Sequence, residues 1–293
     1  MSGRYDLGVW GNAYRSVAVA LVVVVLAGCG GSGTETVTDA RSENGLAYDL
    51  EGAGPIIVLI HGSNLDRRLW DAEMEWLPQR ARVLRYDLRG HGSSNFPRAA
   101  FANHEELIEL LDEIDEDEVT IVGLSFGAHV AVDVALEAPD TVDRLVLVSP
   151  SLQGFVPDEI PPFFADLGAA LRDRDFAQAN EVLLASPLLA VPPEAQDRVR
   201  TMVTENEKMW TIPFQLLQTG SPPALSRLED VSAPTLILVG DTDLAAVRAQ
   251  GELLESQLPD AKLVTVAGGR HLLNLSSPDE FRESVTTFLD EKR

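Results

Sequence analysis

The stretch Val119-Thr-Ile-Val-Gly-Leu-Ser-Phe-Gly-Ala128 decides the fold class. Its first residues form an apolar, β-branched run that is typical of a buried strand, and the residues after Ser125 have the composition of a helix. Gly123, Ser125 and Gly127 give the pattern Gly-x-Ser-x-Gly at the junction. A turn this sharp brings strand and helix together, and glycine removes Cβ atoms that would collide there. The serine hydroxyl is therefore expected above a sheet, at the positive end of a helix.

Short apolar runs alternate with helical patterns from about residue 46 onward. We expect strands at 55–60, 81–86, 119–123, 145–149, 235–240 and 263–266, and helices at 105–114, 126–137, 244–258 and 279–289. The strand runs are rich in Val, Ile and Leu without alternation, as in strands that are covered on both faces. Residues 46–50 are expected to form an edge strand. This order predicts an α/β fold with a mostly parallel sheet and helices on both faces.

The alternation stops between about residues 150 and 229, where prolines recur and oppose continuous sheet. Helices fit between the prolines at 163–172, 176–185 and 194–210. We therefore expect a helical cap inserted over the carboxyl edge of the sheet. Apolar side chains of this segment could line a pocket or simply pack the cap on the sheet: Phe155, Phe163, Phe164, Met209, Trp210 and Phe214.

Composition narrows the possible partners. The formal net charge of −23 at pH 7 argues against nucleic acid, because phosphate binding requires clustered Lys and Arg. Hydrophobic residues make up 45 % of the chain, which is enough for a substantial core. Cys29 is the single cysteine, so an internal disulfide cannot form, and neither a metal nor a cofactor is expected. The expected partner is a small-molecule substrate.

The region before the predicted domain has the features of a targeting segment. Residues 17–27 form an uninterrupted apolar run that is too short for the hydrocarbon core of a bilayer, about 30 Å thick, but typical of a signal peptide. The run closes on Leu26-Ala27-Gly28-Cys29, which resembles the lipobox of bacterial lipoproteins. The resemblance implies cleavage before Cys29, lipidation of its sulfur, and a protein anchored to the extracytoplasmic side of the cell membrane. The alternative is a buried strand, or a cytosolic protein with a misassigned start.

On the lipoprotein interpretation the chain has three parts. Residues 1–28 are a signal peptide, and residues 29–44 are a flexible tether that contains Gly30-Gly-Ser-Gly33. The folded domain occupies residues 45–293, with the cap inserted at about 150–229.

A serine hydroxyl is a weak nucleophile until a base removes its proton. His271 lies in the glycine-rich loop Ala267-Gly-Gly-Arg-His271, directly after the strand predicted at 263–266. Asp241 and Asp243 follow the strand predicted at 235–240, and a carboxylate there could orient the histidine. Catalytic groups of open α/β sheets gather at the carboxyl ends of the strands, so these residues are expected to meet.

These motifs, in their order along the chain, resemble the alpha/beta hydrolase family from about residue 46 to the C-terminus. The resemblance implies an eight-stranded sheet, with Ser125 as nucleophile, Asp243 as acid and His271 as base. Asp241 is then a turn residue. The family's segment at 87–94 is interpreted as a packed turn without a catalytic role.

The resemblance also implies an oxyanion hole. His61-Gly62-Ser63 follows the strand predicted at 55–60, and the expected donors are the backbone N–H groups of Ser63 and Phe126. His61 is then a structural residue that holds the loop.

The function expected from these residues is hydrolysis of a small or medium carboxylic ester or lactone through an acyl-enzyme on Ser125. One alternative is hydrolysis of a C–C bond in a diketone-like substrate, which the same triad supports. Another is a surface-anchored binding protein that keeps the fold without turnover. A serine at position 125 disfavours the haloalkane dehalogenase and epoxide hydrolase branches, which the resemblance associates with an aspartate at that place.

Overall fold

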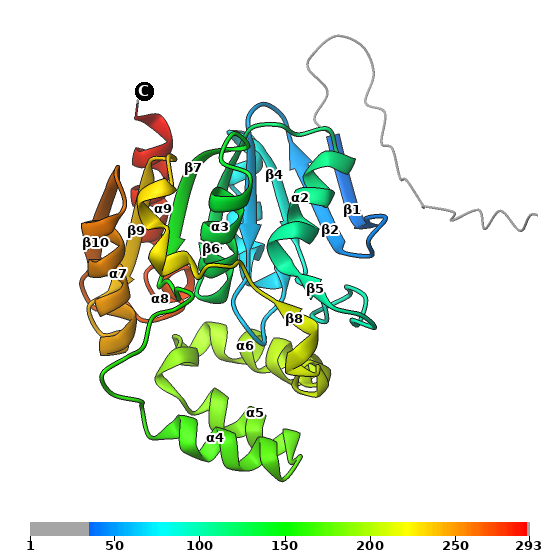
Figure 1. The fold of residues 1–293 in the computed structure, drawn as a ribbon, viewed down its shortest axis with the longest axis vertical. Coiled ribbons are helices and arrows are strands. Elements are labelled where there is room, and N and C mark those ends of the chain that lie inside the picture. The colour runs from blue at the N-terminus through cyan, green and yellow to red at the C-terminus, as the bar shows by residue number, and fades with distance from the viewer. Residues whose placement is uncertain (1–34, 292–293) are drawn as a thin grey trace, which may run out of the picture.

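The computed structural model describes residues 35–291. Its centre is an eight-stranded sheet with the order β1-β2-β4-β3-β6-β7-β9-β10, as Figure 1 shows. The strand β2 (Ala47–Gly52) runs antiparallel to β1 (Glu35–Arg41) and to β4, whereas all other neighbouring pairs are parallel. The mostly parallel eight-stranded sheet is therefore confirmed.

The parallel strands end at a common edge. They are β3 (Ile56–Ile60), β4 (Arg82–Tyr86), β6 (Val119–Leu124), β7 (Val142–Val148), β9 (Thr235–Gly240) and β10 (Ala261–Val266). The register pairs Ile60 with Gly123, and Val266 with Gly240. The loops after these strands consequently emerge side by side, so residues distant in sequence can form one site.

Helices cover both faces of the sheet, as the uninterrupted apolar strands predicted. Alternate residues of β3 point into two cores. Ile56, Val58 and Ile60 pack on the side of α2 (Asn103–Glu113), α3 (Phe126–Glu137) and α7 (Ala245–Gln257). Ile57 and Leu59 pack on the side of α9 (Pro278–Asp290) and the short helix α1 (Asp71–Met74).

The N-terminal boundary differs from the prediction. A flexible tether through residue 44 is wrong, because β1 pairs with β2 from Glu35 opposite Gly52 to Arg41 opposite Ala47. The backbone N–H of Asp39 also donates to Asp49 Oδ1 at 2.8 Å. It follows that β1 is the edge strand and that β2 is an inner strand. The polar composition of residues 35–41 gives little indication of a strand, although Val37 packs against the core. The predicted signal peptide and Cys29 lie outside the described residues.

The cap lies between β7 and β9 and covers the carboxyl edge of the sheet (Figure 1). It contains α4 (Phe163–Arg172), α5 (Phe176–Leu184) and α6 (Pro193–Glu205). The helix predicted to run to residue 210 ends at Glu205, and a separate 3₁₀ turn follows at Glu207–Thr211. The chain returns through β8 (Leu217–Gln218), which pairs with β5 (Phe101–Ala102). None of the helices within residues 35–291 has the length and hydropathy needed to cross a membrane.

Candidate active site

Ser125 occupies a strained turn between β6 and α3, with φ 56° and ψ −113°. A non-glycine residue avoids this region unless its surroundings hold it there. A Cβ on Gly123 would lie 2.3 Å from the carbonyl oxygen of Gly127, so the close approach of strand and helix requires glycine. The N–H of Ser125 donates to the carbonyl of Val148 at 2.9 Å, and the Ser125 carbonyl accepts from the Ser151 hydroxyl at 3.1 Å. The neighbouring strand and loop thus fix the serine backbone.

The loop after β3 lies against this turn. A Cβ on Gly62 would be 3.4 Å from the Cβ of Ser125 and 3.4 Å from the carbonyl oxygen of Leu124. Ser63 is the next residue in this loop. Phe126 is the first residue of α3, where backbone N–H groups have no partner within the helix. The structure therefore brings both segments that carry the predicted oxyanion donors to the serine.

His61 holds this loop through both of its ring nitrogens. Nε2 accepts from the Leu88 N–H at 3.0 Å, and Nδ1 donates to the Gly62 carbonyl at 2.8 Å. The side chain is completely buried, and burial lowers the pKa of His61 to about 4. A neutral imidazole with both nitrogens engaged has no capacity to accept a proton from a substrate or a serine.

His271 and Asp243 form a buried pair at the same edge. Nδ1 of His271 is 2.9 Å from Asp243 Oδ2 and 3.2 Å from Oδ1, and the two residues are 4 % and 6 % exposed. Asp243 Oδ1 also accepts from the Leu244 N–H at 2.7 Å, which fixes the carboxylate. The pairing uses Nδ1 and leaves Nε2 as the nitrogen available for chemistry.

Asp241 has a different position from Asp243. Its Oδ1 accepts from the Gly268 N–H at 2.7 Å, and its own N–H donates to the Val266 carbonyl at 3.0 Å. Asp241 thus braces the turn after β10, and the structure brings Asp243, rather than Asp241, to His271. Ser125, Asp243 and His271 follow β6, β9 and β10 and emerge at one edge of the sheet.

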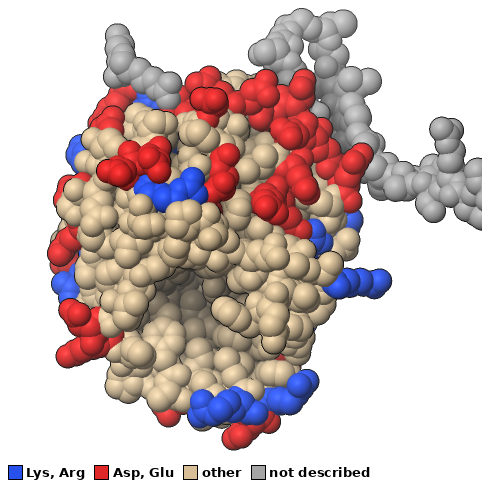
Figure 2. Space-filling model, viewed as in Figure 1, with Lys and Arg blue, Asp and Glu red and all other residues tan. Residues whose placement is uncertain are grey.

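Two of the predicted apolar residues of the cap, Met209 and Phe214, lie in different surroundings. Met209 contacts the loop after β3, because the Asn64 side-chain amide donates to its sulfur at 3.0 Å. Phe214, by contrast, is 85 % exposed and does not line an enclosed pocket. Figure 2 shows a hollow at the level where Figure 1 places the cap below the sheet. The visible walls of this hollow carry no Lys, Arg, Asp or Glu, whereas acidic residues gather at the opposite end of the molecule.

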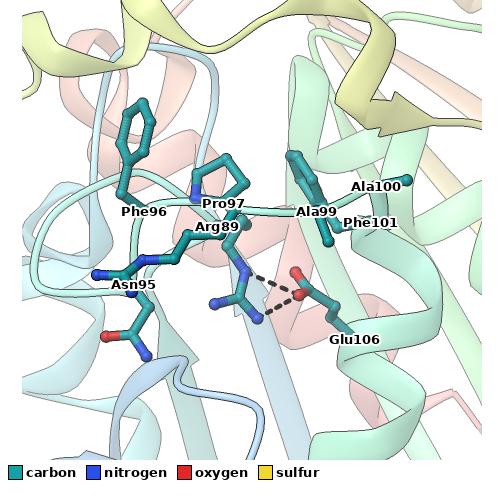
Figure 3. Close-up of a pocket in the computed structure, with 9 residues that line it drawn as sticks. Arg89, Asn95, Phe96, Pro97, Ala99, Ala100, Phe101 and Glu106 are labelled. Atoms are coloured by element: carbon teal, nitrogen blue, oxygen red, sulfur yellow. Dashed lines mark hydrogen bonds and ion pairs between the residues drawn. The ribbon is translucent and has the colours of Figure 1, made fainter.

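A separate cavity of about 570 Å³ opens on the side of α2 (Figure 3). The loop from Asn95 to Phe101 lines it together with an ion pair in which Arg89 Nε donates to Glu106 Oε1 at 2.8 Å. None of the three predicted triad residues lines this cavity. Within residues 35–291 no group of three or more His, Cys, Asp or Glu is arranged to hold a metal ion.

Two buried polar residues near His271 have no signal in the sequence. Glu73 is 2 % exposed and accepts from the Asn274 side-chain amide at 3.3 Å. Burial raises the pKa of Glu73 to about 7. Asn274 lies in α8 (Leu273–Ser276), directly after the loop that carries His271, and its amide also donates to the Leu69 carbonyl at 3.2 Å.

The sequence profile of the Alpha/beta hydrolase family matches residues 57–284. The chain belongs to this family. The family identity agrees with the fold and with the resemblance drawn from the sequence motifs.

Several hydrolases are similar over most of the chain. A pimeloyl-[acyl-carrier protein] methyl ester esterase from Nitrosomonas europaea is 28 % identical over 78 % of this chain and 94 % of its own length. A putative carbamate hydrolase, RutD, from Azorhizobium caulinodans is 26 % identical, covering 84 % of this chain and 95 % of its own. The crystal structure of a hydrolase from Pseudomonas aeruginosa is 27 % identical, with a TM-score of 0.68 over 89 % of this chain and 100 % of that one. This alpha/beta hydrolase is thus similar in sequence to esterases and related hydrolases.

Proposed function

We propose that this alpha/beta hydrolase is a serine hydrolase that cleaves a small or medium carboxylic ester or lactone through an acyl-enzyme on Ser125. The observation that carries the proposal is the 2.9 Å contact between His271 Nδ1 and Asp243 Oδ2, at the edge where the strained Ser125 turn lies. A buried carboxylate on Nδ1 fixes the tautomer whose Nε2 can accept a proton, and it stabilises the imidazolium that results.

The proposed reaction has two halves. Ser125 Oγ attacks the ester carbonyl carbon while His271 Nε2 takes the hydroxyl proton. The N–H groups of Ser63 and Phe126 donate to the oxyanion of the tetrahedral intermediate. The C–O bond to the leaving group then breaks, and His271 returns the proton to the departing alcohol. In the second half His271 deprotonates water, which attacks the acyl-enzyme, and the carboxylic acid leaves as Ser125 regains its proton.

The uncharged walls of the hollow in Figure 2 favour a neutral substrate. A carboxylate or ammonium on the substrate would lose hydration there without gaining a charged partner, which is costly. The names of the similar proteins, a methyl ester esterase and a putative carbamate hydrolase, support the choice of an acyl derivative with a polar leaving group.

The test is labelling of the folded protein with a fluorophosphonate, followed by a panel of p-nitrophenyl esters of increasing acyl length. We expect labelling of wild type and none of Ser125→Ala. An unlabelled wild-type protein with a normal melting transition would overturn the serine mechanism. Turnover of a diketone in the absence of ester hydrolysis would instead favour the C–C bond reaction.

We also propose that lipidation of Cys29 anchors the protein to the extracytoplasmic face of the membrane. The support is the lipobox-like Leu26-Ala27-Gly28-Cys29. Because β1 is antiparallel to β2, and β2 is antiparallel to β4, β1 begins at the sheet edge opposite the cap. Cys29→Ser should move the protein from the membrane fraction to the soluble fraction with its esterase activity intact; a variant that stays in the membrane fraction would disprove the anchor.

A further inference from the structure

The loop after β3 is held from the cap as well as from the sheet. Asp66, three residues after Ser63, is 1 % exposed and accepts from Arg68 Nε at 2.8 Å and Nη2 at 2.7 Å. Burial alone would raise the pKa of Asp66, but the hydrogen bonds from Arg68, together with the electrostatic effects of His61 and Arg68, outweigh burial and hold the pKa below its usual value. Asp66 is therefore a buried carboxylate, and its Oδ2, which accepts from Arg68 Nη2, can accept a further hydrogen bond from a donor on the cap side.

Asn206 supplies that donor. It is completely buried at the C-terminal end of α6. Its amide nitrogen donates to Asp66 Oδ2 at 2.9 Å and to the Met202 carbonyl at 2.9 Å, and its Oδ1 accepts from the Gly92 N–H at 2.6 Å. These partners fix the orientation of the amide, because a carboxylate and a carbonyl can only accept and a backbone N–H can only donate.

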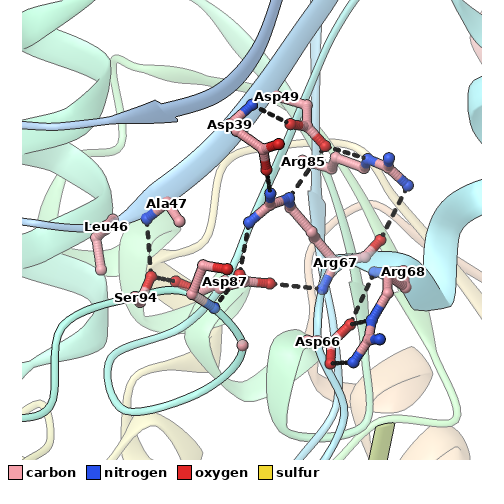
Figure 4. A network of polar contacts seen from close by, with 12 residues as sticks. Asp39, Leu46, Ala47, Asp49, Asp66, Arg67, Arg68, Arg85, Asp87 and Ser94 are labelled. Carbon is pink, nitrogen blue, oxygen red and sulfur yellow. Dashed lines mark hydrogen bonds and ion pairs between the residues drawn. The ribbon is translucent and has the colours of Figure 1, made fainter. Parts of the chain in front are cut away.

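Gly92 is itself part of a rigid network in the sheet domain. A Cβ on Gly92, whose φ is 47°, would lie 2.2 Å from Asp87 Oδ2, so no other residue fits. Asp87 accepts from the Arg67 N–H at 2.8 Å and from Arg67 Nη1 at 2.6 Å, and Arg67 also binds Asp49 at 3.0 Å (Figure 4). Through Gly92 the cap is thus hydrogen-bonded to a rigidly held segment of the sheet domain. Lys208 of the cap also donates to the Gly92 carbonyl, at 2.9 Å.

We propose that Asn206 is a positioning residue that couples the cap, through Asp66, to the loop after β3. This loop carries the proposed oxyanion donor Ser63 and is called the oxyanion loop below. The inference rests on the proposed serine mechanism, in which the Ser63 N–H stabilises the transition state. Removing the amide leaves Asp66 Oδ2 and the Gly92 N–H without their cap-side partner, which favours entry of water or movement of the loop. Because oxyanion donors act on charge that develops only in the transition state, a small displacement lowers kcat more than it raises KM.

The chain offers a matched control in Asn180. It is also a buried asparagine of the cap, 4 % exposed, with two side-chain hydrogen bonds. Its Oδ1 accepts from Trp210 Nε1 at 2.8 Å, and its nitrogen donates to Glu207 Oε2 at 3.0 Å. Both partners lie in the cap, so Asn180→Ala tests cap stability without touching the oxyanion loop.

The experiment compares Asn206→Ala with Asn180→Ala by kcat, KM and the rate at which a fluorophosphonate labels Ser125. We expect Asn206→Ala to lower kcat and the labelling rate by about 10- to 100-fold with KM within about three-fold, as for a weakened oxyanion hole. Asn180→Ala should lower the melting temperature while kcat stays within about two-fold. Equal losses of kcat in the two variants, or a change in KM alone, would overturn the proposal.

A charge swap gives a second, independent readout if the alanine variant does not fold. Asn206→Asp places a carboxylate against Asp66, where the present contact is 2.9 Å, and should lower the labelling rate at least as much. Adding Asp66→Asn restores an amide–carboxylate pair and should recover part of that rate. Absence of recovery would contradict the coupling. A wild-type protein that a fluorophosphonate does not label would instead refute the serine mechanism, so the two failures are distinguishable.

Discussion

His61 and His271 are two buried histidines at the same edge of one sheet, but their side chains bond to different kinds of partner. Both ring nitrogens of His61 bond backbone groups, the Leu88 N–H and the Gly62 carbonyl. His271 has a carboxylate, Asp243, on Nδ1 and keeps Nε2 for chemistry. Since both side chains are nearly fully buried, burial does not distinguish them. Under the proposed mechanism, a carboxylate on Nδ1 that leaves Nε2 available, rather than the depth of burial, separates a proton carrier from a structural residue.

Removing His271 should produce the largest effect. We expect His271→Ala to lower kcat/KM by about 100 000-fold, because serine attack then lacks its base and only the oxyanion hole and substrate binding remain. His129→Ala is the control: His129 lies one turn after Ser125 on α3, but its Nε2 pairs with Asp133 at 3.3 Å. Ester hydrolysis at fixed pH measures both. Comparable losses in the two variants would refute the assignment of the base.

Substitution of the proposed acid should have the next largest effect, and it distinguishes Asp243 from the neighbouring Asp241. We expect Asp243→Asn to lower kcat by about 10 000-fold, because an amide on Nδ1 favours the wrong tautomer of His271. Asp241→Asn should cost less than about ten-fold, since Asp241 binds the Gly268 N–H in a turn. Steady-state kinetics of the two variants, with melting curves, decides between them. A larger loss in Asp241→Asn would reverse the assignment.

His61 should affect stability rather than proton transfer. His61→Phe leaves the buried Leu88 N–H and Gly62 carbonyl unpaired, so we expect a loss of about 2 to 4 kcal/mol in the free energy of unfolding at pH 8. The pKa of His61, about 4 in the folded protein, lies below its ordinary 6.5. The unfolded chain therefore binds the proton first as the pH falls, and stability is lost progressively from about pH 6.5 to pH 4, by up to about 3 kcal/mol.

Urea unfolding at several pH values checks this prediction. The His61→Phe variant should show a shallower loss of stability between pH 6.5 and 4 than wild type. Loss of fluorophosphonate labelling with unchanged stability would mean that His61 takes part in the chemistry after all, and the contrast with His271 would fail.

The site residues that could be predicted are those whose signals are local. Gly123 and Gly127 flank Ser125 in sequence, and His271 follows its strand within one loop. Asn206 had no such signal, because its partners Asp66 and Gly92 are 140 and 114 residues away along the chain. The same reason explains the failure to predict β5 and β8, whose two-residue strands are defined only by each other. Chain-distant contacts also decide which carboxylate meets His271, which the residue spacing had left open.

Glu73 is a buried acid for which we expect the smallest effect on stability. The pH dependence of this effect is opposite to that expected for His61. Its folded-state pKa of about 7 lies above the ordinary 4.5, so the folded protein binds the proton more tightly and stability falls as the pH rises from about 4.5 to 7. Asn274 Oδ1 is buried without a hydrogen-bond partner in the described structure, whereas the amide nitrogen of Asn274 donates to Glu73 Oε2. Glu73→Gln keeps an uncharged side chain of the same size at every pH. We expect it to stabilise the protein by about 1 to 3 kcal/mol at pH 8 and to be neutral near pH 5. Glu75, two residues further along the chain, is exposed, so Glu75→Gln should leave the pH dependence of stability unchanged. If Glu73→Gln were destabilising at pH 8, the ionised carboxylate would have a partner that outweighs its burial, and Glu73 would resemble Asp243 in its ion pair rather than His61 with its uncharged backbone partners.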